Sequence, residues 1–153
     1  MAVLTQTELL ALCNALDDYI NAAEVSNVLC SLIETLREGS NLHNETQASH
    51  GFAVEDIIAR DSGSFVKAQA TPAANSDPVG IVVAVSGDDF TFISGGALPS
   101  QTGLTDGMVY YLSTTAGGRT TTPPSSPNIV VPLFVATSST TGVVHIQQGF
   151  VGA

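Results

Sequence analysis

The chain is short of charge, and above all of positive charge. It has 4 Lys or Arg against 14 Asp or Glu among its 153 residues, so its formal net charge is −10. Nucleic acids and anionic membranes attract proteins through basic side chains, and we therefore expect neither as a partner. Charged residues make up only 12% of the chain, about half of what globular proteins usually carry. A chain of this kind stays soluble through Ser, Thr, Asn and Gln, or it covers part of its surface in an assembly.

Other familiar signals are missing as well. No segment reaches the roughly 18 consecutive apolar residues that cross a bilayer. Residues 1–16 contain no Lys or Arg, whereas a signal peptide begins with basic residues, so we expect a protein made in the cytoplasm. The chain has no Trp, which weakens the case for a sugar-stacking platform. Its 2 Cys residues do not amount to a disulfide framework.

The first 39 residues predict a helical hairpin. Thr5 and Glu8 have the spacing of a capping box, and apolar residues then recur at three- and four-residue steps. A second apolar stripe, out of phase with the first, begins after Asn21 and stops at Gly39. We therefore predict two antiparallel helices over residues 1–39 that serve anchoring or oligomerisation. The packing residues expected on their apolar faces are Leu12, Leu16, Leu29, Leu32 and Leu36.

Two features of this hairpin have alternative interpretations. A turn near residues 21–24 brings Cys13 and Cys30 to similar heights, where two buried thiols are favoured over a disulfide. The hairpin either anchors the protein to a partner or covers one end of its own β core. Two helices of this length bury little surface alone, so both interpretations require a second surface.

Residues 40–51 are polar and aperiodic, and they predict a linker to a β domain over residues 52–153. The fold class is therefore mainly β: the hairpin is followed by a β-sandwich or barrel-like domain of about seven or eight short strands. We expect a strand hairpin over residues 52–68, a turn at Asp88-Asp89 and a long connection over residues 95–107. Because Pro132 cannot donate a ladder hydrogen bond, its strand must be bulged or lie at an edge.

Residue types with catalytic or metal chemistry form no recognised pattern. The chain has no phosphate-binding Gly-rich loop, no nucleophile elbow and no zinc-protease motif. His43 and His50 lie in the predicted linker, so we interpret them as solvated, and we interpret His145 as facing outward from a strand. Asp88-Asp89 fits a turn better than a calcium site or a catalytic pair. We therefore predict a protein that is not an enzyme, with no catalytic residues, no cofactor and no metal.

A set of segments in the β domain carries a resemblance. The segments are residues 65–70, 78–82, 103–113, 116–118 and 132–138. Together they resemble a β module that recurs in the virion proteins of tailed bacteriophages, over residues 62–151. Such modules occur in capsid-decorating, fibre and appendage proteins, commonly as homotrimers. The resemblance implies a virion structural role and implies no catalytic residues.

The middle of this module has a physical interpretation. Leu104 precedes a tight turn at Asp106-Gly107 and is expected to fill the core, with Gly107 supplying a positive φ. Tyr110 and Tyr111 are neighbours on one predicted strand and so point to opposite faces. One ring is expected to fill the core and the other to meet a neighbouring subunit, or both rings pack within one subunit.

From the resemblance we expect a phage capsid decoration (cement) protein that stabilises the head as a homotrimer and resides in the virion. Its partners are then the major capsid protein or another virion protein, together with further copies of itself. One alternative is a tail, head-fibre or baseplate component with a role in host attachment. A second alternative is a carbohydrate-binding β domain. The candidate assembly residues are the five hairpin leucines with Tyr110 and Tyr111.

Overall fold

The computed structural model describes Ala11, residues 41–71 and residues 75–151. Apart from Ala11, the predicted helical hairpin lies outside the described residues. The candidate packing and thiol residues that lie outside them are Leu12, Leu16, Leu29, Leu32, Leu36, Cys13 and Cys30. The helices, their packing and the state of the two thiols therefore stay predictions.

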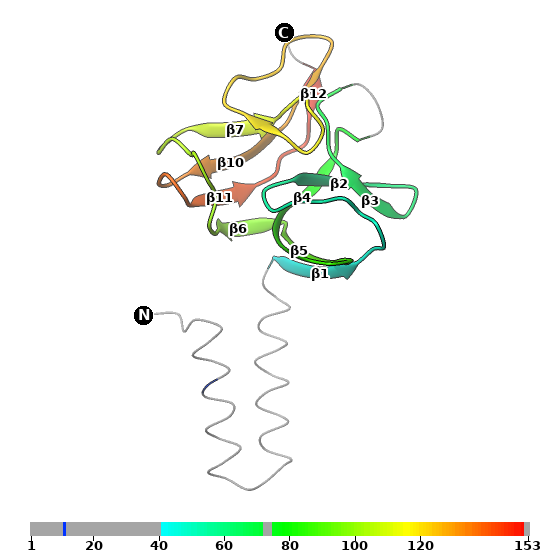
Figure 1. The fold of residues 1–153 in the computed structure, drawn as a ribbon. Coiled ribbons are helices and arrows are strands. Elements are labelled where there is room, and N and C mark those ends of the chain that lie inside the picture. Colours follow the sequence, from blue (N-terminus) through cyan, green and yellow to red (C-terminus); the bar gives the residue numbers. More distant parts are fainter. Residues whose placement is uncertain (1–10, 12–40, 72–74, 152–153) are drawn as a thin grey trace, which may run out of the picture. The chain divides into compact units, whose positions relative to one another are not determined.

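The described part of the chain is mainly β, and every paired strand is antiparallel to its partner (Figure 1). The strands are β1 (Leu42–Thr46), β2 (Ile57–Asp61), β3 (Ser64–Lys67), β4 (Pro78–Ser86), β5 (Asp89–Ile93), β6 (Gly95–Leu98), β7 (Val109–Leu112), β8 (Arg119–Thr120), β9 (Ile129–Val130), β10 (Pro132–Ala136), β11 (Gly142–His145) and β12 (Phe150–Val151). A five-stranded first sheet has the order β1-β5-β4-β2-β3, and a five-stranded second sheet has the order β6-β11-β10-β7-β8. β12 pairs with β9 in a separate two-stranded sheet.

The first and second sheets share one hydrophobic core, as in a β-sandwich. Its members include Ile57, Ile81 and Ile93 from the first sheet and Leu98, Tyr110, Leu112, Leu133, Phe134 and Val144 from the second. Full burial of each such side chain is worth about 1.5–3 kcal/mol. This shared core is therefore the main interaction that holds the two sheets together.

The first sheet is also packed on its opposite face. Successive strand residues point to opposite sides, so Ile57 and Ile81 face the shared core while Ile58 and Val82 face away from it. On that outer side lies a second cluster, the phenylalanine cluster, made of Phe52, Ile58, Phe65, Val82, Phe90 and Phe92. The first sheet thus buries apolar side chains on both faces.

Several sequence predictions are confirmed. β2 and β3 form the expected hairpin, with Asp61 opposite Ser64. Gly87 has a φ of 63° between β4 and β5, which fits the tight turn expected beside Asp88-Asp89. The pairing of β10 with β7 shifts register between Pro132 and Phe134, so the proline strand is bulged, and it lies inside its sheet.

Two predictions about the connections are wrong. The predicted linker contains β1, which pairs with β5 over five positions from Leu42 to Thr46. The predicted long connection contains β6, which pairs with β11. β1 is a polar edge strand with mostly exposed side chains, and β6 begins with two glycines, so neither shows the apolar alternation or β-propensity of a typical strand. With these and the two-residue strands, the described part has twelve strands instead of seven or eight.

Candidate assembly surface

Tyr110 and Tyr111 in β7 point to opposite faces of the second sheet. The Tyr110 side chain is only 6% exposed, and its ring stacks on Phe134 with the centroids 4.8 Å apart and the planes 5° from parallel. Its hydroxyl accepts a hydrogen bond from the Thr105 backbone N–H at 3.0 Å. Tyr110 therefore fills the core and holds the preceding turn, whereas the half-buried Tyr111 lies on the outer face.

The turn before β7 has the form that its sequence predicts. The Leu104 side chain is buried in the shared core. The Met108 backbone N–H donates to the Thr105 carbonyl oxygen at 3.1 Å, and Gly107 has a φ of 76°. Both expectations for this turn are confirmed. The turn leads directly into β7, which pairs with β10.

Four small apolar residues form a row across the outer face of the second sheet. Val135 in β10 lies opposite Val109 in β7 on one side and opposite Val143 in β11 on the other. Val143 in turn lies opposite Ala97 in β6. Directly opposed residues of antiparallel strands point to the same side, so these residues make one continuous line, the valine row. Within it Val143 is 49% exposed and Val135 is 42% exposed.

The buried row beside it shows which face is inward. Phe134 lies opposite Tyr110 on one side and opposite Val144 on the other, and all three are buried in the shared core. β10 and β11 are therefore apolar on both faces. One of those faces packs against the first sheet and the other carries the exposed valines.

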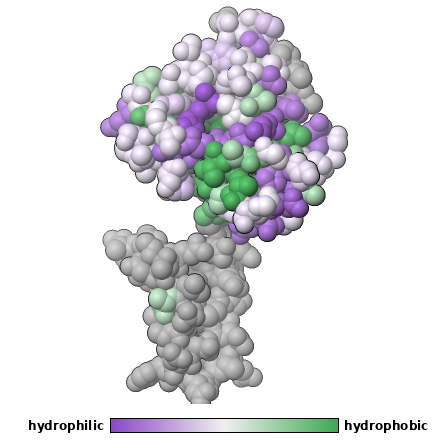
Figure 2. Space-filling view, viewed as in Figure 1, coloured by the Kyte–Doolittle hydropathy of each residue, from purple (hydrophilic) through white to green (hydrophobic). Residues whose placement is uncertain are grey.

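The strands that carry the valine row are uncharged. β6, β7, β10 and β11 contain no Asp, Glu, Lys or Arg. Two positions along from the row lie Tyr111, His145 and a hydroxyl pair, Thr137 and Thr141, whose Oγ1 atoms are 3.1 Å apart. In the view of Figure 2 most of the described surface is pale or purple, with one larger hydrophobic patch and smaller green spots toward the edges.

The charged side chains near the shared core are paired with one another. Arg119 in β8 donates from Nη2 to Glu55 Oε2 at 3.0 Å and from Nη1 to the buried Gln101 Oε1 at 3.1 Å. It also donates to the Thr102 carbonyl oxygen at 2.8 Å. Because Glu55 precedes the first sheet and Arg119 belongs to the second, this ion pair joins the two sheets.

The other described bases also have partners. Lys67 Nζ lies 2.8 Å from Asp56 Oδ2, and the Arg60 guanidinium lies 4.4 Å from the centre of the Phe65 ring. The side chains of residues 41–71 and 75–151 thus form no basic patch of the kind that binds phosphate groups.

His50 differs from its prediction as a solvated linker residue. Its ring is half-buried and packs on Phe52 and Phe90, at centroid distances of 4.8 and 5.1 Å. Nδ1 accepts from the Phe52 backbone N–H at 2.8 Å, and Nε2 lies 3.1 Å from the Gly87 carbonyl oxygen. The tautomer with its proton on Nε2 satisfies both contacts, so His50 fastens the loop after β1 to the β4–β5 turn.

The other two histidines are exposed, as predicted. His43 nevertheless has contacts, because its ring stacks on Phe92 at 4.7 Å and its Nε2 lies 2.9 Å from Ser94 Oγ. His145 faces outward from β11. Asp88 lies in the turn between β4 and β5, and Asp89 begins β5. Their carboxylates accept from the Ser49 N–H at 3.0 Å and from the Thr46 hydroxyl at 2.6 Å.

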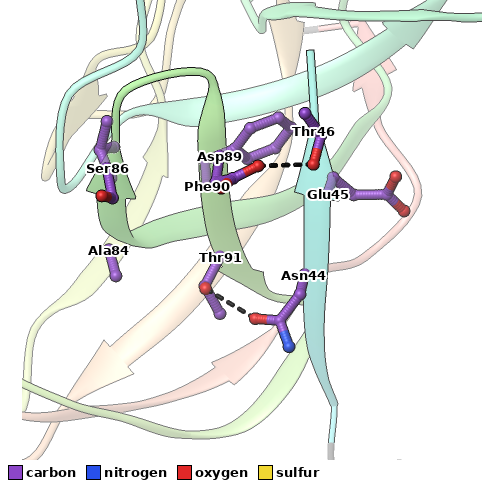
Figure 3. A pocket seen from close by; sticks show the side chains of 9 residues that line it. Asn44, Glu45, Thr46, Ala84, Ser86, Asp89, Phe90 and Thr91 are labelled. Atoms are coloured by element: carbon purple, nitrogen blue, oxygen red, sulfur yellow. Dashed lines mark hydrogen bonds between the residues drawn. The ribbon is translucent and has the colours of Figure 1, made fainter.

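A shallow pocket of about 420 Å³ lies over the strands β1, β5 and β4 (Figure 3). Four of its polar side chains are paired across the strands: Thr91 Oγ1 donates to Asn44 Oδ1 at 2.7 Å, and Thr46 Oγ1 donates to Asp89 Oδ1. Figure 3 shows Asn44 and Thr46 reaching toward β5, with Glu45 turned away from them. The pocket can offer hydroxyl, amide and carboxylate groups to a small polar ligand.

Comparison of the chain with protein-family models, with curated proteins and with solved structures found no match. Among residues 41–71 and 75–151, no three His, Cys, Asp or Glu side chains are grouped so that they could hold a metal ion. Within the described part of the chain, no helix is long and apolar enough to cross a membrane.

The valine row was not found by sequence reasoning. A strand that is apolar on one face shows alternation, whereas residues 133–136 and 143–144 are apolar without interruption. Such a run usually signals a strand buried on both faces. The available signal was the absence of charge from these segments, combined with apolar residues at successive positions. Which of them stay exposed depends on the pairing, which the sequence does not show.

Proposed function

We propose that this chain is a structural protein of a tailed-phage virion, acting as a capsid decoration protein that stabilises the head as a homotrimer. The observation that carries the proposal is the uncharged outer face of the second sheet with the valine row at its centre. An exposed apolar row on rigid strands is typical of surfaces that bind other proteins. The resemblance of residues 62–151 to phage virion modules supports a virion as the assembly.

In this function the protein binds other virion subunits and catalyses no reaction. Each subunit contributes a modest set of apolar and main-chain contacts to neighbouring capsid subunits. A trimer repeats those contacts by rotation, so after the first contact the others form at a high effective concentration. Because the strands are ordered before binding, little conformational entropy is lost when they dock. The sum of these contacts lowers the free energy of the closed shell.

The test is to add the purified full-length chain to phage heads assembled without it. Bound copies are counted after sedimentation, and the release of DNA on heating or chelation is compared with and without the protein. Saturable binding in multiples of three with delayed release supports the proposal. Heads that bind none of the chain and rupture at the same temperature overturn it.

Location on the particle separates decoration from the fibre and baseplate alternative. Gold-labelled antibody against residues 41–151 is applied to intact particles and examined by electron microscopy. Labelling over the head agrees with decoration, whereas labelling confined to the tail or baseplate identifies an appendage protein.

The pocket over β1, β5 and β4 favours a second candidate, carbohydrate binding. Its lining of Asn44, Thr46, Asp89 and Thr91 offers groups that hydrogen-bond to sugar hydroxyls. A glycan array with the full-length chain tests this candidate, with Asn44→Ala as the matched variant. A glycan that binds the wild-type chain and not the variant supports it, and an array without signal eliminates it.

A further inference from the structure

We propose that the valine row is the surface through which copies of this chain contact one another. The inference deepens the proposed function, because it rests on the homotrimer and names the face that forms it. It concerns only self-association, so it can fail while binding to the phage head is correct, and the reverse also holds.

The first step is geometric. Ala97, Val143, Val135 and Val109 lie directly opposite one another on β6, β11, β10 and β7. Neighbouring strands are spaced by about 4.8 Å, so the row crosses the sheet over roughly 14 Å. Its side chains are short and branched or smaller, and they present a low, even ridge. A ridge of this kind packs well against an identical one, because neither surface carries a long side chain that must be displaced.

The second step concerns charge. The chain has a net charge of −10, so two copies repel each other wherever their acidic surfaces meet. The first sheet carries three acidic side chains, Glu45, Asp61 and Asp89, and two basic ones, Arg60 and Lys67, on its strands. The strands of the valine row carry no charge of either sign. Two copies can therefore meet on these four strands without placing strand carboxylates against one another.

The third step separates a second copy from other occupants. A basic partner gains nothing from a neutral face, because its charges find no opposite charges there. A neutral face is complementary to itself, and with only 4 Lys or Arg in the chain copies cannot associate through many ion pairs. Three copies about one axis bring their rows together and enclose them in a common apolar core.

The row is the centre of such an interface, and a neighbouring side chain enlarges it. A standard interface buries about 800 Å² on each partner, which exceeds what four small side chains provide. Tyr111 is half-buried on the same face. Tyr is enriched in protein interfaces, so Tyr111 extends the contact around the row.

The test compares full-length variants by sedimentation equilibrium at micromolar concentration. Val143→Asp and Val135→Asp each place a carboxylate in the row, where association would bury it unpaired. Val85→Asp is the matched control, because Val85 is 37% exposed on β4 of the first sheet. We expect the wild-type chain and the control to be oligomeric. For both row variants we expect a dissociation constant about a hundredfold higher.

Val143→Thr guards against a folding defect, because it keeps the branched shape and favours a strand. Its circular dichroism is expected to match that of the wild-type chain, with a smaller loss of association. A wild-type chain that is monomeric at micromolar concentration overturns the inference. An oligomer that is unchanged by both Asp substitutions also overturns it, and then residues 1–40 or a different virion protein are the occupants to examine.

Binding to phage heads is measured in parallel on the same proteins. A chain that self-associates through the valine row and does not bind heads retains the inference and loses the proposed function. A monomer that binds heads loses the inference and retains the proposed function.

Discussion

The first and second sheets have five antiparallel strands each and share one core, yet they differ in how far their outer faces are covered. The first sheet covers its outer face with its own phenylalanine cluster and with the loop that carries His50 and Phe52. The second sheet leaves Val135 and Val143 exposed on strands without charge. A face that the chain covers itself serves stability, whereas an uncovered apolar face is available to a partner. The two faces should therefore respond to substitution in different ways.

The largest difference is expected between Phe90→Ala and Val143→Ala. Phe90 is buried, and its ring contacts those of Phe52 and Phe65 at 5.0 and 5.3 Å. Its truncation should lower the free energy of unfolding by about 4 kcal/mol. Val143→Ala should change it by no more than about 0.5 kcal/mol when the chain is dilute enough to be monomeric. Urea denaturation followed by circular dichroism measures both, and equal losses would show that the two faces do not differ.

The next largest effect is expected from removing β1. The chain divides by its internal contacts between Ser40 and Asn41, so a chain that begins at Asn41 keeps the whole first sheet. A chain that begins at Phe52 loses β1 and also Gln47, whose side chain donates to the Phe65 carbonyl oxygen and accepts from the Phe65 N–H. The two Gln47 bonds, at a net value of about 1 kcal/mol each, and the lost pairing of β1 with β5 should together make the shorter chain less stable by about 3 kcal/mol or more.

Thermal unfolding of these two truncated chains measures the difference directly. Identical melting temperatures would mean that β1 adds nothing to the stability of the first sheet. Residues 42–46 would then behave energetically as a linker.

A smaller loss is expected where β4 approaches its neighbour closely. A Cβ atom on Gly80 would lie 2.3 Å from Phe92 Cδ2 and 2.8 Å from the Ile93 carbonyl oxygen. Gly80→Ala should therefore destabilise the chain by about 2–3 kcal/mol through overpacking. In the control Gly95→Ala, the three nearest atoms among the described residues belong to the exposed Asn41 side chain, the closest at 3.2 Å, and this side chain can move. A control that is as unstable as Gly80→Ala would contradict the close approach.

The smallest of these effects concerns the ion pair between the two sheets. Glu55→Gln removes the carboxylate that accepts from Arg119, while the contacts of Arg119 with Gln101 and Thr102 remain. We expect a loss of about 1.5 kcal/mol in the free energy of unfolding. Asp61→Asn is the control, since among the described residues the Asp61 carboxylate accepts only from the adjacent Ser62 hydroxyl, and it should change stability by less than about 0.5 kcal/mol. A Glu55→Gln chain as stable as this control would refute a joining role for the ion pair.

The strands with strong β-propensity were predictable from local sequence. Residues 79–85, 90–93 and 108–113 combine branched or aromatic residues with flanking turns, and all fall within or around observed strands. β1 and β6 were not predicted, because edge strands need no apolar alternation and pairing with one neighbour is enough to hold them. Arg119 and Glu55 are 64 positions apart, so no local pattern connects them.

The same distinction applies to the candidate site. The pairing of Tyr110 with the core and Tyr111 with the outer face follows from the alternation of one strand, although the sequence left open which ring is which. The valine row joins four strands whose order is β6-β11-β10-β7, an order that differs from their order along the chain. Its members become neighbours only through hydrogen bonding between strands.

By itself the sequence determined a charge-poor, mainly β chain with fixed turns, because side-chain alternation, glycine and proline act within a few residues of their own position. Only the tertiary structure decided which apolar face stays uncovered, since that depends on which strands pair and on where the phenylalanine side chains are used. Burial is a property of the whole packing arrangement, and no single segment contains the information to set it.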